Sequence, residues 1–260
     1  MSSLLYYALP ALGSYALLSI LFLRRPRLLH APPAPAFRPR LAAHRSGSGE
    51  RLENTMEALE NSMAQRADLI ELDCHLTRDR VVVVSHDENL SRQSGVNRDV
   101  GSLDFEVADL VRHFDRSEIT IWASEKSSVM KKCKAANPEM PTSLTVSRVV
   151  WVLLLYYLGL LPFVPIPEKF LLCFLPTIIN RTYFPFSCPA LNKLAAVAFK
   201  WIIMRKSLIQ HLEQRGVQVV FWCLNEESDF ETAFSLGATG VMTDYPTALR
   251  HYLDRHRGTS

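Results

Sequence analysis

The sequence predicts an α/β fold: a TIM-type (β/α)8 barrel that lacks one βα unit and carries an N-terminal transmembrane helix. Three observations predict it. Residues 4–23 contain no charged side chain. From residue 41 onward, short apolar runs alternate with helical stretches, which is typical of repeated βα units around a parallel sheet. Short polar motifs then follow several of these apolar runs.

The N-terminal apolar run predicts a retained membrane anchor. Residues 4–23 are long enough, as a helix, to cross the hydrocarbon core. Arg24, Arg25 and Arg27 follow the run rather than precede it, which argues against a cleavable signal peptide. The positive-inside bias then places the rest of the chain in the cytoplasm. The expected domains are an anchor (1–23), a basic, proline-rich linker (24–40), a barrel (41–255) and a tail (256–260).

The elements of the barrel are predicted from apolar runs and helical periodicity. The expected strands are 41–44, 69–74, 81–85, 119–123, 143–146, 217–224 and 240–243. The expected helices are 56–65, 125–135, 207–215 and 246–253. Asn54 is the expected N-cap of the first helix, with Glu57 as its capping-box partner. Gly216 suits a helix end, Pro246 suits a helix start, and the valines of 81–84 suit a strand covered on both faces.

One βα unit of the barrel is missing from this pattern. The sequence offers seven strands, and residues 41–255 fall short of the roughly 250 residues typical of the fold. The gap lies between Asp87 and Glu118, where the sequence is polar.

The triplet Glu71-Leu72-Asp73 predicts a cation site. Residues two apart on a strand face the same way, and two adjacent carboxylates are unfavourable unless a cation or basic group lies between them. Oxygen ligands suit Mg²⁺ or Ca²⁺. The plainer alternative is an exposed edge strand with solvated acids.

Two histidines predict acid–base chemistry. His44 and His86 each follow a predicted strand, at the end where barrel enzymes build their active sites. Two imidazoles can divide the roles of general acid and general base, and Arg45 offers donors suited to phosphate oxygens. Either histidine alone is better explained as a strand cap, but the set His44, Arg45 and His86 predicts cleavage of a phosphodiester.

Composition excludes other classes of function. The net charge is only +3 and the basic residues are scattered, so no nucleic-acid partner is expected. The five cysteines lack metal-ligand spacing and predict free thiols in a reducing compartment. Trp222, Asn225 and Asp244 are expected at the barrel mouth, where substrate contact and packing are equally well supported. Nothing in the sequence indicates an oligomeric state.

The motifs closely resemble those of the glycerophosphodiester phosphodiesterase family, and the whole chain resembles its membrane-anchored, lysophospholipase D branch. The residues that carry the resemblance are His44-Arg45, Glu53-Asn54-Thr55, Glu71-Leu72-Asp73, Thr77-Arg78-Asp79, His86-Asp87, Trp222 with Asn225, and Thr243-Asp244-Tyr245-Pro246. The resemblance implies a TIM barrel and a divalent metal, Ca²⁺ or Mg²⁺, held partly by Glu71 and Asp73. It implies His44 and His86 as the acid–base pair, with His86 either a proton carrier or a metal neighbour.

The resemblance also implies a substrate and a location. Members of this branch cut lysophosphatidylcholine-like lysophospholipids to lysophosphatidic acid and a free head group. The protein is therefore expected in the endoplasmic reticulum or perinuclear membrane, with its barrel facing the cytoplasm and Trp222 and Asn225 contacting the substrate.

Two departures from the family pattern stand out. Ser46 follows Arg45 where the family has glycine, and the sequence contains no Glu-x-Lys triplet, the family's source of a further metal carboxylate. Glu118, at the start of the next predicted strand, is a weak substitute for that missing carboxylate. The chain therefore resembles an internally shortened form, and a catalytically impaired, membrane-bound variant is the main alternative. A different two-histidine barrel phosphodiesterase, acting on inositol lipids, is less consistent with the motifs.

Residues 149–179 form an apolar insertion in the predicted barrel. Residues 149–167 are 19 uncharged positions with three prolines, and 170–179 are again apolar. A single crossing would place the strands before and after it on opposite sides of the bilayer. We therefore expect a hairpin or interfacial segment that returns to the cytoplasmic side, at the active-site face. Packing on the barrel exterior is the alternative.

Overall fold

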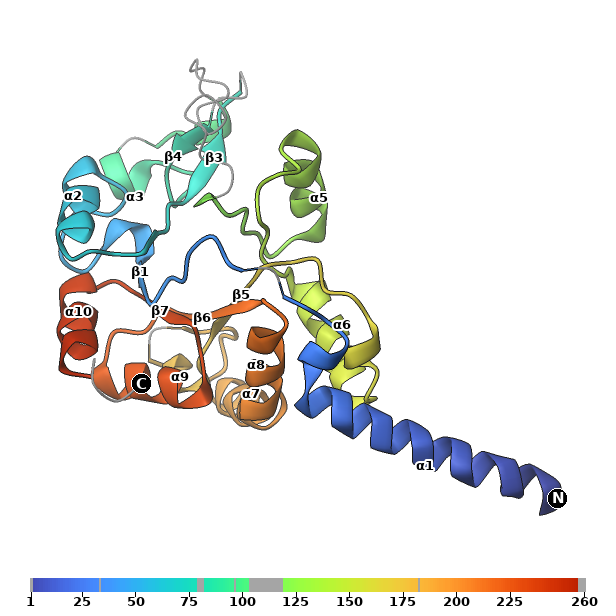
Figure 1. The fold of residues 1–260 in the computed structure, drawn as a ribbon. Helices are drawn as coiled ribbons and strands as arrows, with labels where there is room; N and C mark the ends of the chain where they lie inside the picture. Colours follow the sequence, from blue (N-terminus) through green and yellow to red (C-terminus); the bar gives the residue numbers. More distant parts are fainter. Residues whose placement is uncertain are drawn as a thin grey trace.

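The centre of the fold is a five-stranded parallel sheet in the order β2-β1-β7-β6-β5 (Figure 1). Its strands are β1 (Leu41–Ala43), β2 (Leu69–Ile70), β5 (Phe170–Phe174), β6 (Gln218–Trp222) and β7 (Gly240–Thr243). Parallel bridges from Ser143 to Phe170 and from Trp122 to Thr142 continue the sheet beyond β5. The computed structural model describes residues 2–32, 34–78, 82–95, 97–102, 119–181 and 183–256.

Helices surround this sheet. The α-helices are α1 (Ser2–Arg24), α2 (Met56–Ala64), α3 (Ser91–Ser94), α5 (Ser127–Ala136), α6 (Val146–Tyr157), α7 (Pro189–Ile202), α8 (Lys206–Gln214), α9 (Glu227–Leu236) and α10 (Pro246–Arg255). Short 3-10 turns are η1 (Pro26–Leu28), η2 (His44–Ser46), η3 (Val100–Ser102), η5 (Leu161–Phe163) and η6 (Pro176–Ile178).

The core follows from strand alternation. Leu41, Phe221 and Val241 are fully buried on one face of the sheet, against residues of α8, α9 and α10 such as Leu212 and Leu249. The intervening residues of the same strands, Ala42, Val220 and Met242, form a separate cluster on the other face. The sheet is thus covered by apolar packing on both faces, as parallel sheets require.

Several predicted elements are confirmed: the parallel sheet, the N-terminal apolar helix, and strands or helices close to 41–44, 56–65, 125–135, 207–215, 217–224, 240–243 and 246–253. The first helix starts at Met56 as expected, but its N-cap is not the expected residue. Thr55, rather than Asn54, accepts the capping hydrogen bond from the Ala58 N–H, at 3.3 Å, and Asn54 has a φ of 59°.

A strand lies within 81–85 as predicted, but the expectation that it is covered on both faces in the parallel sheet is wrong. β4 (Val82–Val84) pairs antiparallel with β3 (Cys74–Leu76) in a separate two-stranded hairpin, and Figure 1 shows the hairpin apart from the sheet. The side chains of Val82 and Val84 are about half exposed. A valine run indicates a strand but does not specify its partner, and a hairpin leaves one face open to solvent.

The region between the hairpin and α5 holds less regular structure than predicted. The expected strands 119–123 and 143–146 are reduced to the two parallel bridges, and Val146 already begins α6. Glu118 and most of the expected gap lie outside the described residues. Within the apolar segment 149–179, Phe170–Phe174 is strand β5, paired along its length with β6.

Helix α1 projects away from the body of the molecule (Figure 1). Tyr6–Arg24 is the one helix among the described residues that is long and apolar enough to cross a membrane, with a mean hydropathy of 1.6. Its C-terminal end packs against the body. The Nδ1–H of His211, on α8, donates to the Leu23 carbonyl at 2.9 Å and satisfies one of the carbonyls that a helix end leaves unpaired.

His211 makes stability depend on pH. Burial lowers its pKa from 6.5 to about 4; the bond to Leu23 opposes this, and Arg215 and His30 add to it. The unfolded chain therefore binds a proton between pH 6.5 and 4 that the folded chain does not. Stability should be fully present above pH 6.5 and fall by about 3 kcal/mol as the pH drops to 4.

This dependence can be measured by thermal unfolding of the full chain in detergent at pH 7.5 and 4.5. The variant His211→Gln, which keeps a donor for Leu23, should lose less stability on acidification than the wild type. The exposed His251→Gln is the matched control and should behave like the wild type. Equal losses in all three proteins would contradict the assignment.

Candidate active site

Three strands bring the first site residues to one edge of the sheet. Ala43 is in register with Ile70 of β2 and with Thr243 of β7. The next residues along the chain, His44, Glu71 and Asp244, therefore leave the sheet at the same level. This is the carboxyl edge, where α/β barrels build their active sites.

Asp244 is the centre of a hydrogen-bond cluster. One carboxylate oxygen accepts from His44 Nδ1 at 2.7 Å and from the Ser48 hydroxyl. The other accepts from Asn225 Nδ2 at 2.7 Å and from Cys223 Sγ at 3.0 Å. Burial acts to raise the pKa of Asp244, but these hydrogen bonds outweigh it and hold the pKa far below its ordinary range. An ionised Asp244 accepts the Nδ1 proton of His44 and leaves Nε2 free to exchange a proton.

Arg45 lies between the two predicted carboxylates. Its backbone N–H donates to Glu71 Oε2 at 2.8 Å, and its Nε is 3.4 Å from Asp73 Oδ2. The turn after β1 needs left-handed backbone at Arg45, Ser46 and Gly47, with φ of 47°, 62° and 88°. Ser46 thus adopts the conformation that a glycine would take more readily.

The carboxylates of Glu71 and Asp73 have the properties of a cation site. Burial and the charge of Asp73 raise the pKa of Glu71, although the bond from Arg45 and the charges of His44 and Arg45 oppose the rise. Asp73 Oδ2 is buried and, among the described residues, accepts no hydrogen bond. A hard divalent cation would relieve both conditions, and carboxylate oxygens are its preferred ligands. The residues therefore fit Mg²⁺ or Ca²⁺.

A chain of ion pairs connects this region with His86. Glu53 accepts from Arg45 NH1 at 3.1 Å and from Arg92 NH2 at 2.6 Å. Arg92 also pairs with Asp87, which accepts from His86 Nδ1 at 2.7 Å. Arg92 and His86 lower the pKa of Asp87 to about 2. His86 follows the β3–β4 hairpin rather than a sheet strand, but the network ties it to Arg45 through three intermediates.

The potential metal ligands group differently from the expectation. In the described part of the chain, one group of three has its donor atoms within 4.8 Å of one another: His44, Cys223 and Asp244. Glu71, Asp73 and His86 do not form such a group. Burial and Asp244 raise the pKa of Cys223 far above its ordinary value, so this thiol is a hydrogen-bond donor rather than a thiolate ligand.

Trp222 and Asn225 have different environments. Trp222 ends β6 and contacts the rings of Phe174 and Tyr183, with centroids 6.1 and 5.7 Å away, so it forms part of an aromatic wall at the carboxyl edge. The Asn225 amide is engaged: it donates to Asp244 and accepts from the Asp244 N–H at 3.0 Å and the Thr243 hydroxyl at 3.1 Å.

Sequence reasoning missed three members of this network. Cys223 lies between Trp222 and Asn225 at the same strand end, and this position could have identified it as a member of the network. Ser48 follows the His44-Arg45 motif within one turn. Arg92 has no local signal, because its role depends on a long side chain on α3 that reaches both Glu53 and Asp87.

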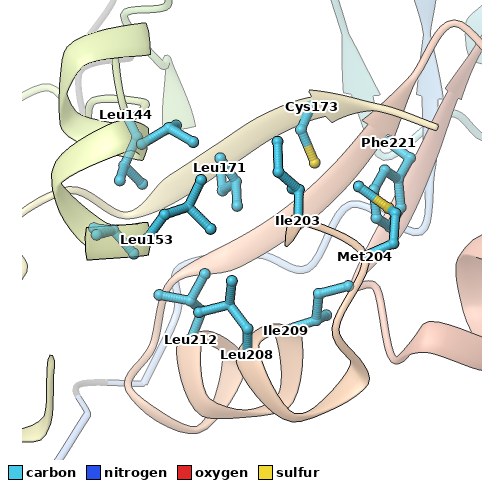
Figure 2. Close-up of a pocket in the computed structure, with 12 residues that line it drawn as sticks. Leu144, Leu153, Leu171, Cys173, Ile203, Met204, Leu208, Ile209, Leu212 and Phe221 are labelled. Atoms are coloured by element: carbon cyan, nitrogen blue, oxygen red, sulfur yellow. The ribbon is translucent and has the colours of Figure 1, made fainter. Parts of the chain in front are cut away.

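The apolar cavity shown in Figure 2 is a packing void and not the substrate site. It measures about 20 Å³ and lies between β5, β6, α6 and α8, lined by residues such as Leu153, Leu171 and Phe221. That volume holds no more than one water molecule.

Comparison with known proteins decides the family. The sequence profile of the glycerophosphoryl diester phosphodiesterase family matches residues 44–143 and 106–248. The chain belongs to this family. It is 68% identical to "Lysophospholipase D GDPD3" of Homo sapiens over 98% of both chains. It is 35% identical to "Lysophospholipase D GDPD1" of Homo sapiens over 97% of this chain and 98% of that one.

Solved structures agree on the fold. The glycerophosphoryl diester phosphodiesterase domain of a Mycobacterium tuberculosis protein superposes with a TM-score of 0.62 at 13% identity, over 82% of this chain and 98% of that chain. A glycerophosphodiester phosphodiesterase from Agrobacterium tumefaciens gives 0.57 at 15%, over 82% and 99%. The predicted resemblance to the family, and to relatives named as lysophospholipases D, is confirmed. The chain is a member of a family of phosphodiester hydrolases with a TIM-barrel-like α/β fold.

Proposed function

We propose that this protein is a metal-dependent lysophospholipase D, which hydrolyses lysophosphatidylcholine-like lysophospholipids to lysophosphatidic acid and a free head group. The observation that carries the proposal is the convergence of His44, Arg45, Glu71 and Asp73 at one sheet edge. The names of the curated relatives support the substrate class.

Each residue has a role in the proposed reaction. Glu71 and Asp73 would hold a divalent cation, which supplies Lewis-acid polarisation of the phosphoryl oxygens when bound. Arg45 offers its guanidinium to the negative charge that develops on the phosphate. His44, oriented by Asp244, exchanges a proton through Nε2 with the nucleophile or the leaving alcohol. His86 takes the complementary role or lies beside the metal, and the nucleophile is water or the glycerol hydroxyl.

Two further assignments concern the substrate. Trp222 offers an apolar wall to the bound lysophospholipid, with Phe174 and Tyr183 behind it. Asn225 acts as a positioning residue, since its amide is committed to Asp244.

The membrane anchor is part of the proposal. Helix α1 has the length and composition of a span, and Arg24, Arg25 and Arg27 follow it. By the positive-inside bias the sheet faces the cytoplasm, and the family resemblance points to the endoplasmic reticulum or perinuclear membrane.

A second candidate is a catalytically impaired form. The alignment with the human relative has 311 positions, more than the 260 residues of this chain, so the relative contains residues that this chain lacks. The family profile also matches in two overlapping segments. A missing βα unit, with its Glu-x-Lys strand, would account for both observations and would leave the cation with fewer carboxylates.

The test is choline release from lysophosphatidylcholine by the full chain in detergent. Turnover should require Mg²⁺ or Ca²⁺, fall to background with a chelator, and return when metal is added back. A matched variant carries a Glu-x-Lys strand inserted between residues 102 and 119. Turnover only in that variant would favour the impaired form, and metal-independent turnover would contradict the proposed site.

A further inference from the structure

An exposed apolar turn, made of the last residue of α6, the residues after it and η5, lies at the edge of the sheet opposite the active site. It comprises residues 157–163, and it precedes β5, so it lies at the amino edge of the parallel strands. The side chains of Tyr157, Leu158, Leu160 and Phe163 are between 38% and 53% exposed. The expectation that this part of the insertion lies at the active-site face is therefore wrong, because α6 runs back along the sheet as the helix of a βα unit.

The turn packs against the last turns of α1. The Ser19 hydroxyl donates to the Gly159 carbonyl at 2.7 Å, and the Tyr15 hydroxyl donates to the Leu158 carbonyl. Gly159 has a φ of +72°, and a Cβ there would lie 2.3 Å from Ser19 Oγ. The fit is thus specific for glycine, and the turn and the helix form one unit.

Five carbonyls of the turn, those of residues 158–162, have hydrogen-bond partners within the protein. In addition to the bonds from α1, Arg215 donates to the Leu161 and Val164 carbonyls at 2.8 and 2.7 Å. His30 lies 2.6 Å from the Pro162 carbonyl, and the Phe163 N–H donates to the Leu160 carbonyl at 3.0 Å. In hydrocarbon every backbone polar group must be paired internally, and irregular backbone is tolerated only on that condition.

The positions of Ser19 and Tyr15 along α1 indicate how deep the turn lies in the membrane. Ser19 and Tyr15 precede Arg24 by five and nine residues, which corresponds to about 7.5 and about 13.5 Å along the helix axis. Half of the hydrocarbon core is about 15 Å thick. With Arg24 at the membrane surface, the turn lies below that surface.

We propose that residues 157–163 insert into the leaflet that faces the sheet, beside α1, as a second membrane contact. This rests on α1 being a membrane span, as proposed above. Trp201 is 63% exposed at the end of α7, and Arg205 lies over its ring at 5.6 Å. The Tyr157 hydroxyl donates to the neighbouring Ile202 carbonyl at 2.7 Å, so this aromatic and basic pair borders the turn. Such pairs are typical of the membrane–water interface.

A second membrane contact fixes the orientation of the sheet relative to the bilayer. The turn lies at the amino edge of the sheet, whereas His44 and Asp244 lie at the carboxyl edge. Two contacts, α1 and the turn, hold the amino edge on the bilayer and direct the active site away from it. The lysophospholipid must then reach the site from the aqueous side.

A photoreactive amino acid placed at single positions of the full chain tests this proposal. The chain is reconstituted in phosphatidylcholine vesicles that contain a clickable phosphatidylcholine, and lipid adducts are counted after irradiation. Position Leu160 is the test, Leu9 in α1 is the positive control, and Met63 on α2 is an equally apolar control with 62% exposure away from the turn. Adducts are expected at Leu9 and Leu160 and at least tenfold fewer at Met63.

The outcomes separate the inference from its premise. Adducts at Leu9 but not at Leu160 would overturn the inserted turn and leave the anchor standing. Absence at both would refute the anchor itself. Protein–protein adducts at Leu160 would show that a second copy, rather than lipid, covers the turn.

Discussion

Replacing His44 with alanine should lower kcat for choline release by about 10²–10⁴-fold with little change in KM. The reason is that Asp244 fixes the Nδ1 of His44 at 2.7 Å, which leaves Nε2 for proton transfer. The cluster itself should survive, because Ser48, Cys223 and Asn225 still donate to Asp244. Far-ultraviolet circular dichroism and the melting temperature check that the variant is folded.

Two further variants define the role. Asp244→Asn replaces an acceptor with an amide and should favour the opposite tautomer of His44, so kcat should fall while substrate binding persists. His251→Ala, on the exposed face of α10, should keep wild-type rates. If His44→Ala retained more than a tenth of wild-type kcat, the acid–base assignment would be wrong.

The gathering of the site could be predicted because parallel strands end at one edge. His44, Glu71 and Asp244 each directly follow a strand, and the register of β1 with β2 and β7 places them at one level. Local rules of this kind depend only on the positions of apolar runs. They also predicted the closing helix and the N-terminal apolar helix, whose signals lie within a single element.

Pairing between distant segments could not be predicted in the same way. The valines of 82–84 read equally well as a buried strand and as half of a hairpin, since the choice depends on β3 and not on the valines. The role of Arg92 arises from the reach of its side chain to Glu53 and Asp87. The apolar turn at 157–163 was recognised as apolar, but its position required knowledge of the direction of α6.

The contact between the turn at 157–163 and α1 also could not be predicted from the sequence. Ser19 and Tyr15 are polar residues within an apolar run, and the sequence alone does not say what they contact. Their hydroxyls donate to the carbonyls of Leu158 and Gly159, which follow the end of α6, where a helix leaves carbonyls without intrahelical partners.

Removing the charge of Glu71 should abolish the response to metal without unfolding the chain. Burial and Asp73 raise the pKa of Glu71, so without a cation its ionised form destabilises the folded state at neutral pH. Glu71→Gln keeps an acceptor for the Arg45 N–H and removes that repulsion. The metal-free variant should therefore be at least as stable as the metal-free wild type, yet inactive.

Metal titration followed by thermal unfolding separates this prediction from a general loss of structure. At a free metal concentration 100 times Kd, the wild type should gain about 2.7 kcal/mol of stability. Glu71→Gln and Asp73→Asn should gain far less, since each removes one of the two carboxylates that would hold the cation. Glu231→Gln, exposed on α9, should respond like the wild type. An unchanged gain in both site variants would place the metal elsewhere and would contradict the assignment of Glu71 and Asp73 as its ligands.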